Sequence, residues 1–183
     1  MDEAATLASW QRQEEEFHAR RRLGPAGSTP GVARPEQLAG KSGLEIMEGM
    51  FSGELPAPPI AETLDFTIID IEKGRAVFQG RPQLRHYNPL GTVHGGWFAT
   101  LLDSAVGCAV QTMLPAGKSY TTLELKVNML RALNVGVPLV RAEGKVIHAG
   151  KQVATAEGRL FDAAGRLYAH ATTTCLVFDV RER

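Results

Sequence analysis

One short stretch, Tyr87 to Val110, holds most of the residues in this chain that could do chemistry. It reads YNPLGTVHGGWFATLLDSAVGCAV. A carboxylate, Asp103, stands in an otherwise apolar segment, and the loop before it carries Asn88, His94, Gly95 and Gly96. Burying a carboxylate costs several kcal/mol unless it is paired or hydrogen-bonded. Asp103 therefore either bonds to a nearby hydroxyl or backbone group, or serves as a base or nucleophile.

The glycine pair is expected at the start of a helix. Backbone N–H groups there lack intrahelical partners, and the helix dipole adds positive potential. Glycine leaves these amides open to a closely approaching ligand. Gly95 and Gly96 therefore suit an oxyanion site, in which N–H groups stabilise a developing negative charge. The alternative is a glycine pair that only turns the chain.

Spacing limits how these residues can act together. Gly96 and Asp103 are seven residues apart, so they share a helix face but are separated by roughly 10 Å along the axis. One carbonyl carbon cannot contact both residues. If both act on one substrate, they come from two helices packed antiparallel. This predicts a two-fold dimer with its sites at the interface.

The elements that would position these residues follow from periodicity. Residues 95–114 are apolar nearly all round, which predicts a buried helix. Alternating segments predict two strands joined at 72–74, one strand over 121–130, and three strands in 137–180 with turns at 149–150 and 162–165. In the 121–130 strand, one face carries Thr121, Leu123, Leu125, Val127 and Met129, and Thr122 falls on the polar side. Together they predict an α+β fold with about six antiparallel strands curled around one helix.

The N-terminal segment differs from the rest. Residues 3–22 predict a very polar helix, either solvated or docked on a partner, and 23–37 read as a linker rich in glycine and proline. A short amphipathic helix is expected over 41–52, ended by the Pro-Ala-Pro-Pro run at 56–59. We therefore divide the chain into an N-terminal helix and linker, 1–40, and a main domain, 41–183.

Composition excludes several classes of protein. The 183 residues include 20 Lys and Arg and 20 Asp and Glu, so no overall field favours nucleic acid or an anionic membrane. Cys108 and Cys175 lie in apolar runs without metal-ligand spacing, which predicts reduced thiols and no metal site. The sequence shows no nucleotide fingerprint, signal peptide or membrane-spanning run. We expect a cytoplasmic protein without a cofactor.

The motif itself resembles a known family. The pattern N-x-x-G-x-x-H-G-G followed by a helical Asp is similar to that of hotdog-fold acyl-CoA thioesterases of the PaaI type. The resemblance covers about residues 42–178. It implies an antiparallel sheet wrapped around one long helix, in homodimers or dimers of dimers with interface sites. It also implies hydrolysis of an acyl-CoA to a carboxylate and free CoA, with a phenylacetyl-type or medium acyl group.

The resemblance also implies roles. Asp103 would activate water or attack the carbonyl itself, and the amides of Gly95 and Gly96 from the other subunit would polarise the thioester. Asn88 would orient the water or hold the loop. His94 would stabilise the helix start or bond near the thioester, and Thr122 would help to place the water. The CoA tail would meet a hairpin carrying His148, Gly150 and Lys151.

Two other functions stay open at this stage. A hotdog-fold hydratase would carry an Asp-x-Asn-Pro-x-His motif, whereas here His86 stands where that aspartate belongs. A non-catalytic acyl-CoA sensor would usually carry a DNA-binding segment, and the helix ending in Arg20, Arg21 and Arg22 is too short for one. Release of free thiol from acyl-CoA separates the thioesterase from both.

Overall fold

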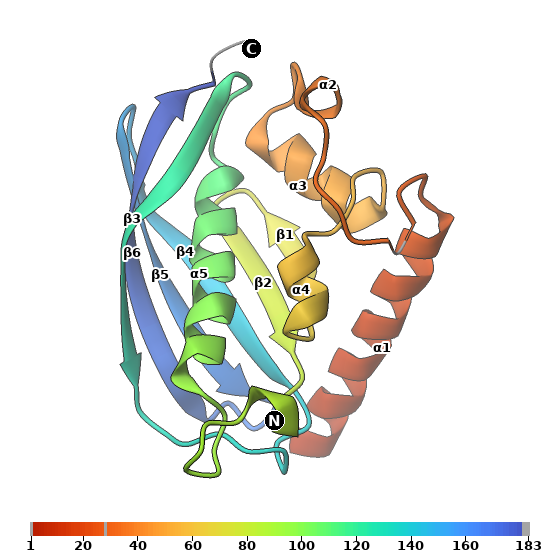
Figure 1. Ribbon diagram of the computed structural model, residues 1–183, viewed down its shortest axis with the longest axis vertical. Coiled ribbons are helices and arrows are strands. Elements are labelled where there is room, and N and C mark those ends of the chain that lie inside the picture. Colours follow the sequence, from red (N-terminus) through yellow and green to blue (C-terminus); the bar gives the residue numbers. More distant parts are fainter. Residues whose placement is uncertain (1, 28, 181–183) are drawn as a thin grey trace.

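A six-stranded antiparallel sheet curls around one helix in the computed structural model, which describes residues 2–27 and 29–180 (Figure 1). The central helix is α5, Gly95–Gln111. The sheet order is β1-β2-β4-β5-β6-β3. The strands are β1 Phe66–Glu72, β2 Arg75–Gly80, β3 Lys118–Met129, β4 Val140–Ala149, β5 Val153–Asp162 and β6 Leu167–Asp179. The predicted α+β hotdog arrangement is confirmed.

Helix α5 forms the centre of the core, but only part of its surface is buried. Leu101, Leu102 and Ala105 are fully buried against the inner face of the sheet. Thr100 and Asp103 lie on a side that remains partly open to solvent. The expectation of a helix buried all round is therefore wrong for a single chain. The helix also ends at Gln111, earlier than the predicted residue 114.

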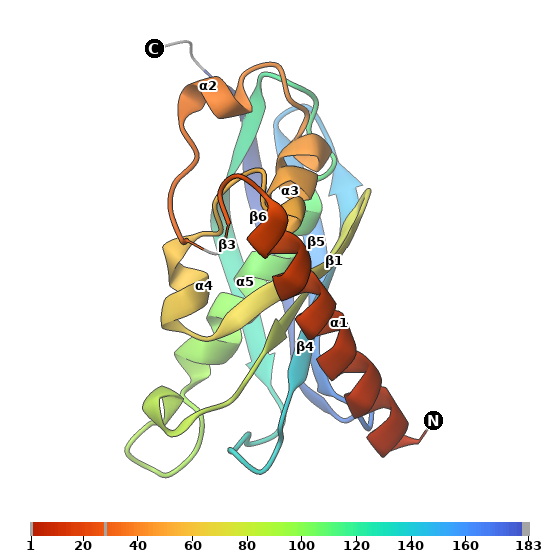
Figure 2. The ribbon, with the colours of Figure 1, turned by 90° about the vertical axis from the view of Figure 1, so that its right-hand side faces the viewer.

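The N-terminal helix α1, Glu3–Leu23, is mostly exposed, as its polarity predicts, but one face docks on the rest of its own chain. It crosses the outer face of the sheet, opposite α5 (Figure 2). Trp10 and Phe17 are buried, and the Arg141 guanidinium lies 4.2 Å above the Trp10 ring. Trp10 also meets Phe161 edge to face at 6.0 Å. Two aromatic residues seven positions apart share a helix face, and they suffice to dock a helix that is polar elsewhere.

Short helices connect α1 to the sheet. The predicted short amphipathic helix is α3, Gly43–Ser52, and it begins with a capping box between Ser42 and Glu45. It ends at Gly53, whose φ of +85° suits glycine, and not at the proline run. That run leads instead into α4, Pro59–Thr63, which we did not predict. Short turns α2, Pro35–Leu38, and η1, Leu84–His86, complete the connections. The domain boundary at residue 40 stays a prediction.

A register shift in β3 overturns the predicted facing of that strand. The pairing with β6 slips between Thr122 and Glu124, which marks a β-bulge. A slip of one residue sends the following side chains to the opposite face. Thr122, before the bulge, therefore faces α5. Leu123, predicted to face the core, is the extra residue of the bulge and is 60% exposed. Leu125 and Val127 pack against the core beyond the bulge.

Strand β3 is also one edge of the sheet. Among the described strands it pairs with β6 alone, and at 12 residues it is longer than the other edge strand, β1, with 7. A long edge strand presents unpaired backbone N–H and C=O groups to a second chain. Exposed Leu123 and Met129 add apolar surface along this edge.

Candidate active site

Asp103 and Thr122 form one half of the candidate site. The Thr122 hydroxyl Oγ1 donates a hydrogen bond to Asp103 Oδ1 across 3.2 Å. Both side chains are partly buried between α5 and the edge strand β3. No lysine or arginine within the described ranges makes an ion pair with this carboxylate. A carboxylate with one hydroxyl partner and an open side can accept a proton from water.

The start of α5 forms the other half. His94 is the N-cap residue, and its Nδ1 accepts the Gly96 N–H at 2.8 Å. An accepting Nδ1 requires the tautomer that carries its hydrogen on Nε2, so His94 presents an Nε2–H donor to solvent. Within residues 2–27 and 29–180, the Gly95 N–H makes no hydrogen bond. The Gly95 amide is therefore open, whereas the Gly96 amide, expected to be bare, is already engaged.

Asn88 holds the loop before the helix. Its Oδ1 accepts the N–H groups of Leu90 at 2.9 Å and Thr92 at 3.3 Å, and its Nδ2 donates to Thr92 Oγ1 at 2.9 Å. The loop is anchored at its far end by the His94 N–H, which donates to the His86 carbonyl at 2.7 Å. In this chain the Asn88 amide is used within its own loop, which favours loop-holding over orienting water.

The two halves do not meet within one chain. Gly95 lies in the first turn of α5 and Asp103 in the third, on a straight helix. A rise of 1.5 Å per residue separates them by roughly 12 Å. One thioester cannot contact both residues of the same helix. Each chain therefore carries two half-sites.

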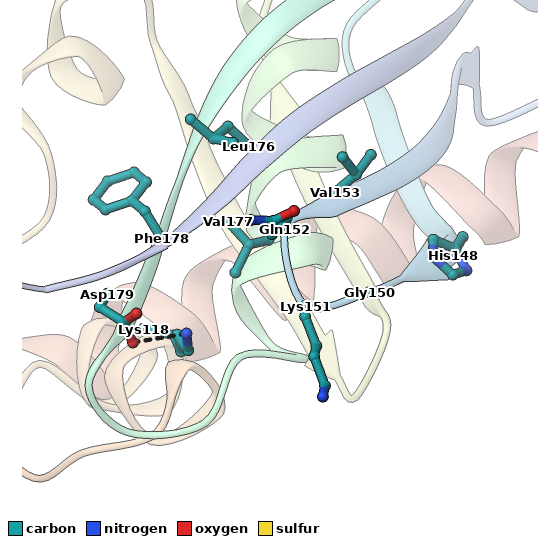
Figure 3. A pocket seen from close by; sticks show the side chains of 10 residues that line it. All are labelled: Lys118, His148, Gly150, Lys151, Gln152, Val153, Leu176, Val177, Phe178 and Asp179. Carbon is teal, nitrogen blue, oxygen red and sulfur yellow. Dashed lines mark ion pairs between the residues drawn. The ribbon is translucent and has the colours of Figure 1, made fainter.

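A groove near the other end of β3 collects the predicted CoA contacts. His148, Gly150 and Lys151 line one open groove of about 760 Å³ (Figure 3). Lys118, which we did not predict, joins them and pairs with Asp179 at 2.7 Å. The remaining lining residues are Gln152, Val153, Leu176, Val177 and Phe178. A glycine directly before Lys118 marks the start of β3, which the sequence could have indicated. The sequence could not indicate that Lys118 lies beside residues of distant strands.

Other chemistries find less support around this site. Burial, together with the negative charge of Asp103, raises the pKa of Cys108 to about 12. Cys108 is therefore a protonated thiol at neutral pH and a poor nucleophile. Among the described residues, no three His, Cys, Asp or Glu side chains gather as a metal centre requires. None of the helices in the described ranges has both the length and the apolarity needed to cross a membrane.

Comparison with known proteins shows the family of this chain. Residues 90–169 match the model of the thioesterase superfamily. A Saccharolobus solfataricus protein named as an esterase is 35% identical over 115 residues, which is 63% of this chain and 80% of that protein. The chain belongs to the thioesterase superfamily. As a member of this superfamily it is a thioester hydrolase of the hotdog fold, as its motif predicted.

Two further proteins are similar to this chain over most of their own length. The 1,4-dihydroxy-2-naphthoyl-CoA hydrolase of Listeria monocytogenes is 28% identical over 67% of this chain and 98% of its own length. The crystal structure of a phenylacetic acid degradation-related protein from Ralstonia eutropha JMP134 superposes with a TM-score of 0.65. It is 30% identical over 70% of this chain and 97% of that one. The residues matched by the superfamily model begin at 90, so they exclude the N-terminal helix and linker.

Proposed function

We propose that this chain hydrolyses acyl-CoA thioesters at sites shared between two copies. The observation that carries the proposal is the separation of the half-sites on one helix. The open Gly95 amide and the Asp103 carboxylate share helix α5, but they are roughly 12 Å apart. A second chain, related by a two-fold axis, brings its own Asp103 to the first chain's Gly95.

The edge strand β3 supports a dimer in which the two sheets join edge to edge. Two β3 strands that pair antiparallel extend the sheet and satisfy the unpaired backbone groups of both edges. Such pairing also covers exposed Leu123 and brings the open sides of the two α5 helices together. A two-fold axis then generates two equivalent sites per dimer. Pairing of dimers into tetramers is compatible with this arrangement.

The proposed chemistry uses both halves of the site. The thioester oxygen accepts hydrogen bonds from Gly95 N–H and from His94 Nε2–H of one copy. Asp103 of the other copy takes a proton from a water that Thr122 helps to hold, and the water oxygen bonds to the carbonyl carbon. Collapse of the tetrahedral intermediate breaks the C–S bond and releases the CoA thiolate, which takes up a proton. Direct attack by Asp103 would instead give an anhydride, which water then opens.

The groove and the relatives support a CoA ester as the substrate. Lys118 and Lys151 offer ammonium groups to the phosphates of CoA, and His148 lies in the same groove. The Ralstonia eutropha relative is named for phenylacetic acid degradation, which supports a phenylacetyl-type acyl group. The protonated thiols Cys108 and Cys175 make no disulfide, which supports a cytoplasmic location.

The sharpest test removes one backbone N–H. Gly95 occupies the first helical position, where proline is well tolerated, and the extended backbone of His94 is compatible with a following proline. Gly95→Pro deletes the N–H, whereas Gly95→Ala keeps it. Both add a Cβ that must displace the flexible end of Met129, so this effect is common to the two variants. We expect Gly95→Pro to lose about 10²-fold or more in kcat for thiol release. Gly95→Ala should retain much more activity. Equal activity of both variants would contradict the role of this amide.

Mixing variants tests whether the site is shared. Gly95→Pro and Asp103→Asn are each expected to be nearly inactive as pure dimers. In a mixed dimer one of the two sites combines an intact Gly95 with an intact Asp103. Co-expression in equal amounts should therefore restore about a quarter of wild-type activity. No recovery in co-purified mixed dimers would place both residues in one chain's site and overturn the shared arrangement.

A further inference from the structure

Met129, the last residue of β3, packs directly on the helix start. A Cβ atom placed on Gly95 would lie 2.6 Å from Met129 Cε and 2.8 Å from its Sδ. Such distances are far shorter than a normal van der Waals contact, so the thioether occupies the space that a side chain at residue 95 would need. The absence of a Cβ at Gly95 is what lets Met129 reach this position.

The methionine has one covered side and one open side. Its thioether rests on Gly95, yet the residue as a whole is 52% exposed. Met129 belongs to β3, the edge strand along which the second chain would pair. Beyond the bulge, Met129 continues the series Leu125 and Val127, which pack toward the core. It therefore leans inward past the end of the sheet and stands beside the open Gly95 amide.

This position constrains what can surround a bound carbonyl. A carbonyl oxygen that accepts the Gly95 N–H lies about 2.9 Å from that nitrogen. Carbon 2 of the acyl group is two bonds farther on, within about 5 Å of Gly95, which is within reach of the thioether. A methionine side chain is flexible and polarizable, so it can follow an unbranched chain closely. A substituent on carbon 2 would compete with it for the same space.

We propose that Met129 determines specificity at the thioester by excluding acyl groups branched at carbon 2. The inference rests on the proposed function, because it places the substrate carbonyl at the Gly95 amide. Unbranched acyl groups, aliphatic or arylalkyl, fit beside the thioether. Branched isomers of the same size must displace it, and a misfit of one methyl group is worth roughly tenfold or more in kcat/KM.

The test compares isomeric substrates, so that the CoA portion and the carbon count cancel. Butanoyl-CoA is paired with 2-methylpropanoyl-CoA, and 3-phenylpropanoyl-CoA with 2-phenylpropanoyl-CoA. We expect Met129→Ala to raise the branched-to-unbranched ratio of kcat/KM by about tenfold. Met129→Leu, which nearly conserves volume, should keep the wild-type ratio within about twofold. Met129→Phe should lower the ratio further. The matched control is Leu130→Ala, since Leu130 is the next residue and is similarly exposed, at 57%.

The possible outcomes distinguish a failure of the role of Met129 from a failure of the proposed thioesterase function. If wild type releases thiol but Met129→Ala and Met129→Phe keep its ratio, or Leu130→Ala shifts the ratio as much as Met129→Ala does, the role of Met129 is overturned and the proposed function stands. If wild type releases no thiol from any acyl-CoA, the proposed function fails and this inference fails with it. If Met129→Ala does not fold, the Phe variant carries the test, because its predicted shift has the opposite sign.

Discussion

The Thr122 hydroxyl and the Asp103 carboxylate, 3.2 Å apart, join the edge strand β3 to the central helix α5. This contact orients one carboxylate oxygen, Oδ1, and among the described residues it is the hydrogen bond that the carboxylate makes. The hydroxyl can in turn accept a hydrogen bond from a water beside Asp103.

Replacing Asp103 by Asn keeps the shape of the side chain and removes the proposed base. We expect kcat for thiol release to fall by about 10²–10⁴-fold. Thr122→Val, which deletes only the hydroxyl, should lower kcat by about tenfold with little change in KM, and Thr122→Ser should restore most of the loss. Steady-state kinetics on one acyl-CoA measure all three variants. Near-wild-type turnover by Asp103→Asn would exclude Asp103 as base or nucleophile.

The lysines of the groove predict that KM depends on the CoA portion of the substrate. Lys118→Ala and Lys151→Ala each remove one cation from the groove. We expect each to raise KM for acyl-CoA several-fold, with a smaller effect at high salt because ions screen exposed charges. The corresponding acyl-N-acetylcysteamine, which lacks the phosphates, serves as the control substrate. A similar rise in KM for both substrates would mean that these lysines do not bind phosphate.

The docking of α1 predicts a large difference between two apolar residues of one helix. Trp10 is buried beneath Arg141, whereas Leu23 is 89% exposed. We expect Trp10→Ala to lower the free energy of unfolding by about 3–5 kcal/mol. Leu23→Ala should change it by less than about 0.5 kcal/mol. Thermal or urea unfolding measures both. Similar small effects would show that α1 contributes little to the stability of the fold.

Asp162 predicts a pH dependence of stability. Burial alone would raise the pKa of this carboxyl, but hydrogen bonds from the Arg166 backbone and side chain and from Tyr168 more than compensate and lower it. Because the pKa is lower in the folded state, the stabilisation is present above the unfolded value of about 4. It is lost as the pH falls through the folded value.

The corresponding variant is Asp162→Asn. We expect it to be less stable than wild type at pH 7 by about 1–3 kcal/mol, and this difference should shrink below about pH 4. Urea unfolding at a series of pH values measures it. Glu36→Gln is the control, because the Glu36 side chain is 79% exposed. A difference that stays constant down to acidic pH would contradict the ionised role of Asp162.

The features that depend on neighbouring residues could be predicted from the sequence. The period of the apolar residues placed α5 and the strands. The Ser42–Glu45 capping box accompanies the short amphipathic helix, and glycine turns mark the hairpins. The order His94, Gly95, Gly96 at a helix start and Asp103 two turns later pointed to the chemistry. The same spacing predicts that two chains share a site, because the rise of a helix is constant.

Only the tertiary structure decided which distant residues meet. The bulge after Thr122 reverses the facing that strict alternation predicts, because register is set by pairing with β6 and not by the strand itself. Helix α1 docks on the outer face of the sheet because Arg141 of β4 and Phe161 of β5 both contact Trp10 there, while Phe17 meets Phe51 of α3. Likewise Lys118 joins the groove, and Met129 reaches Gly95, through strand positions far apart in the sequence. Local periodicity determines the elements, and long-range pairing and packing determine what they place together.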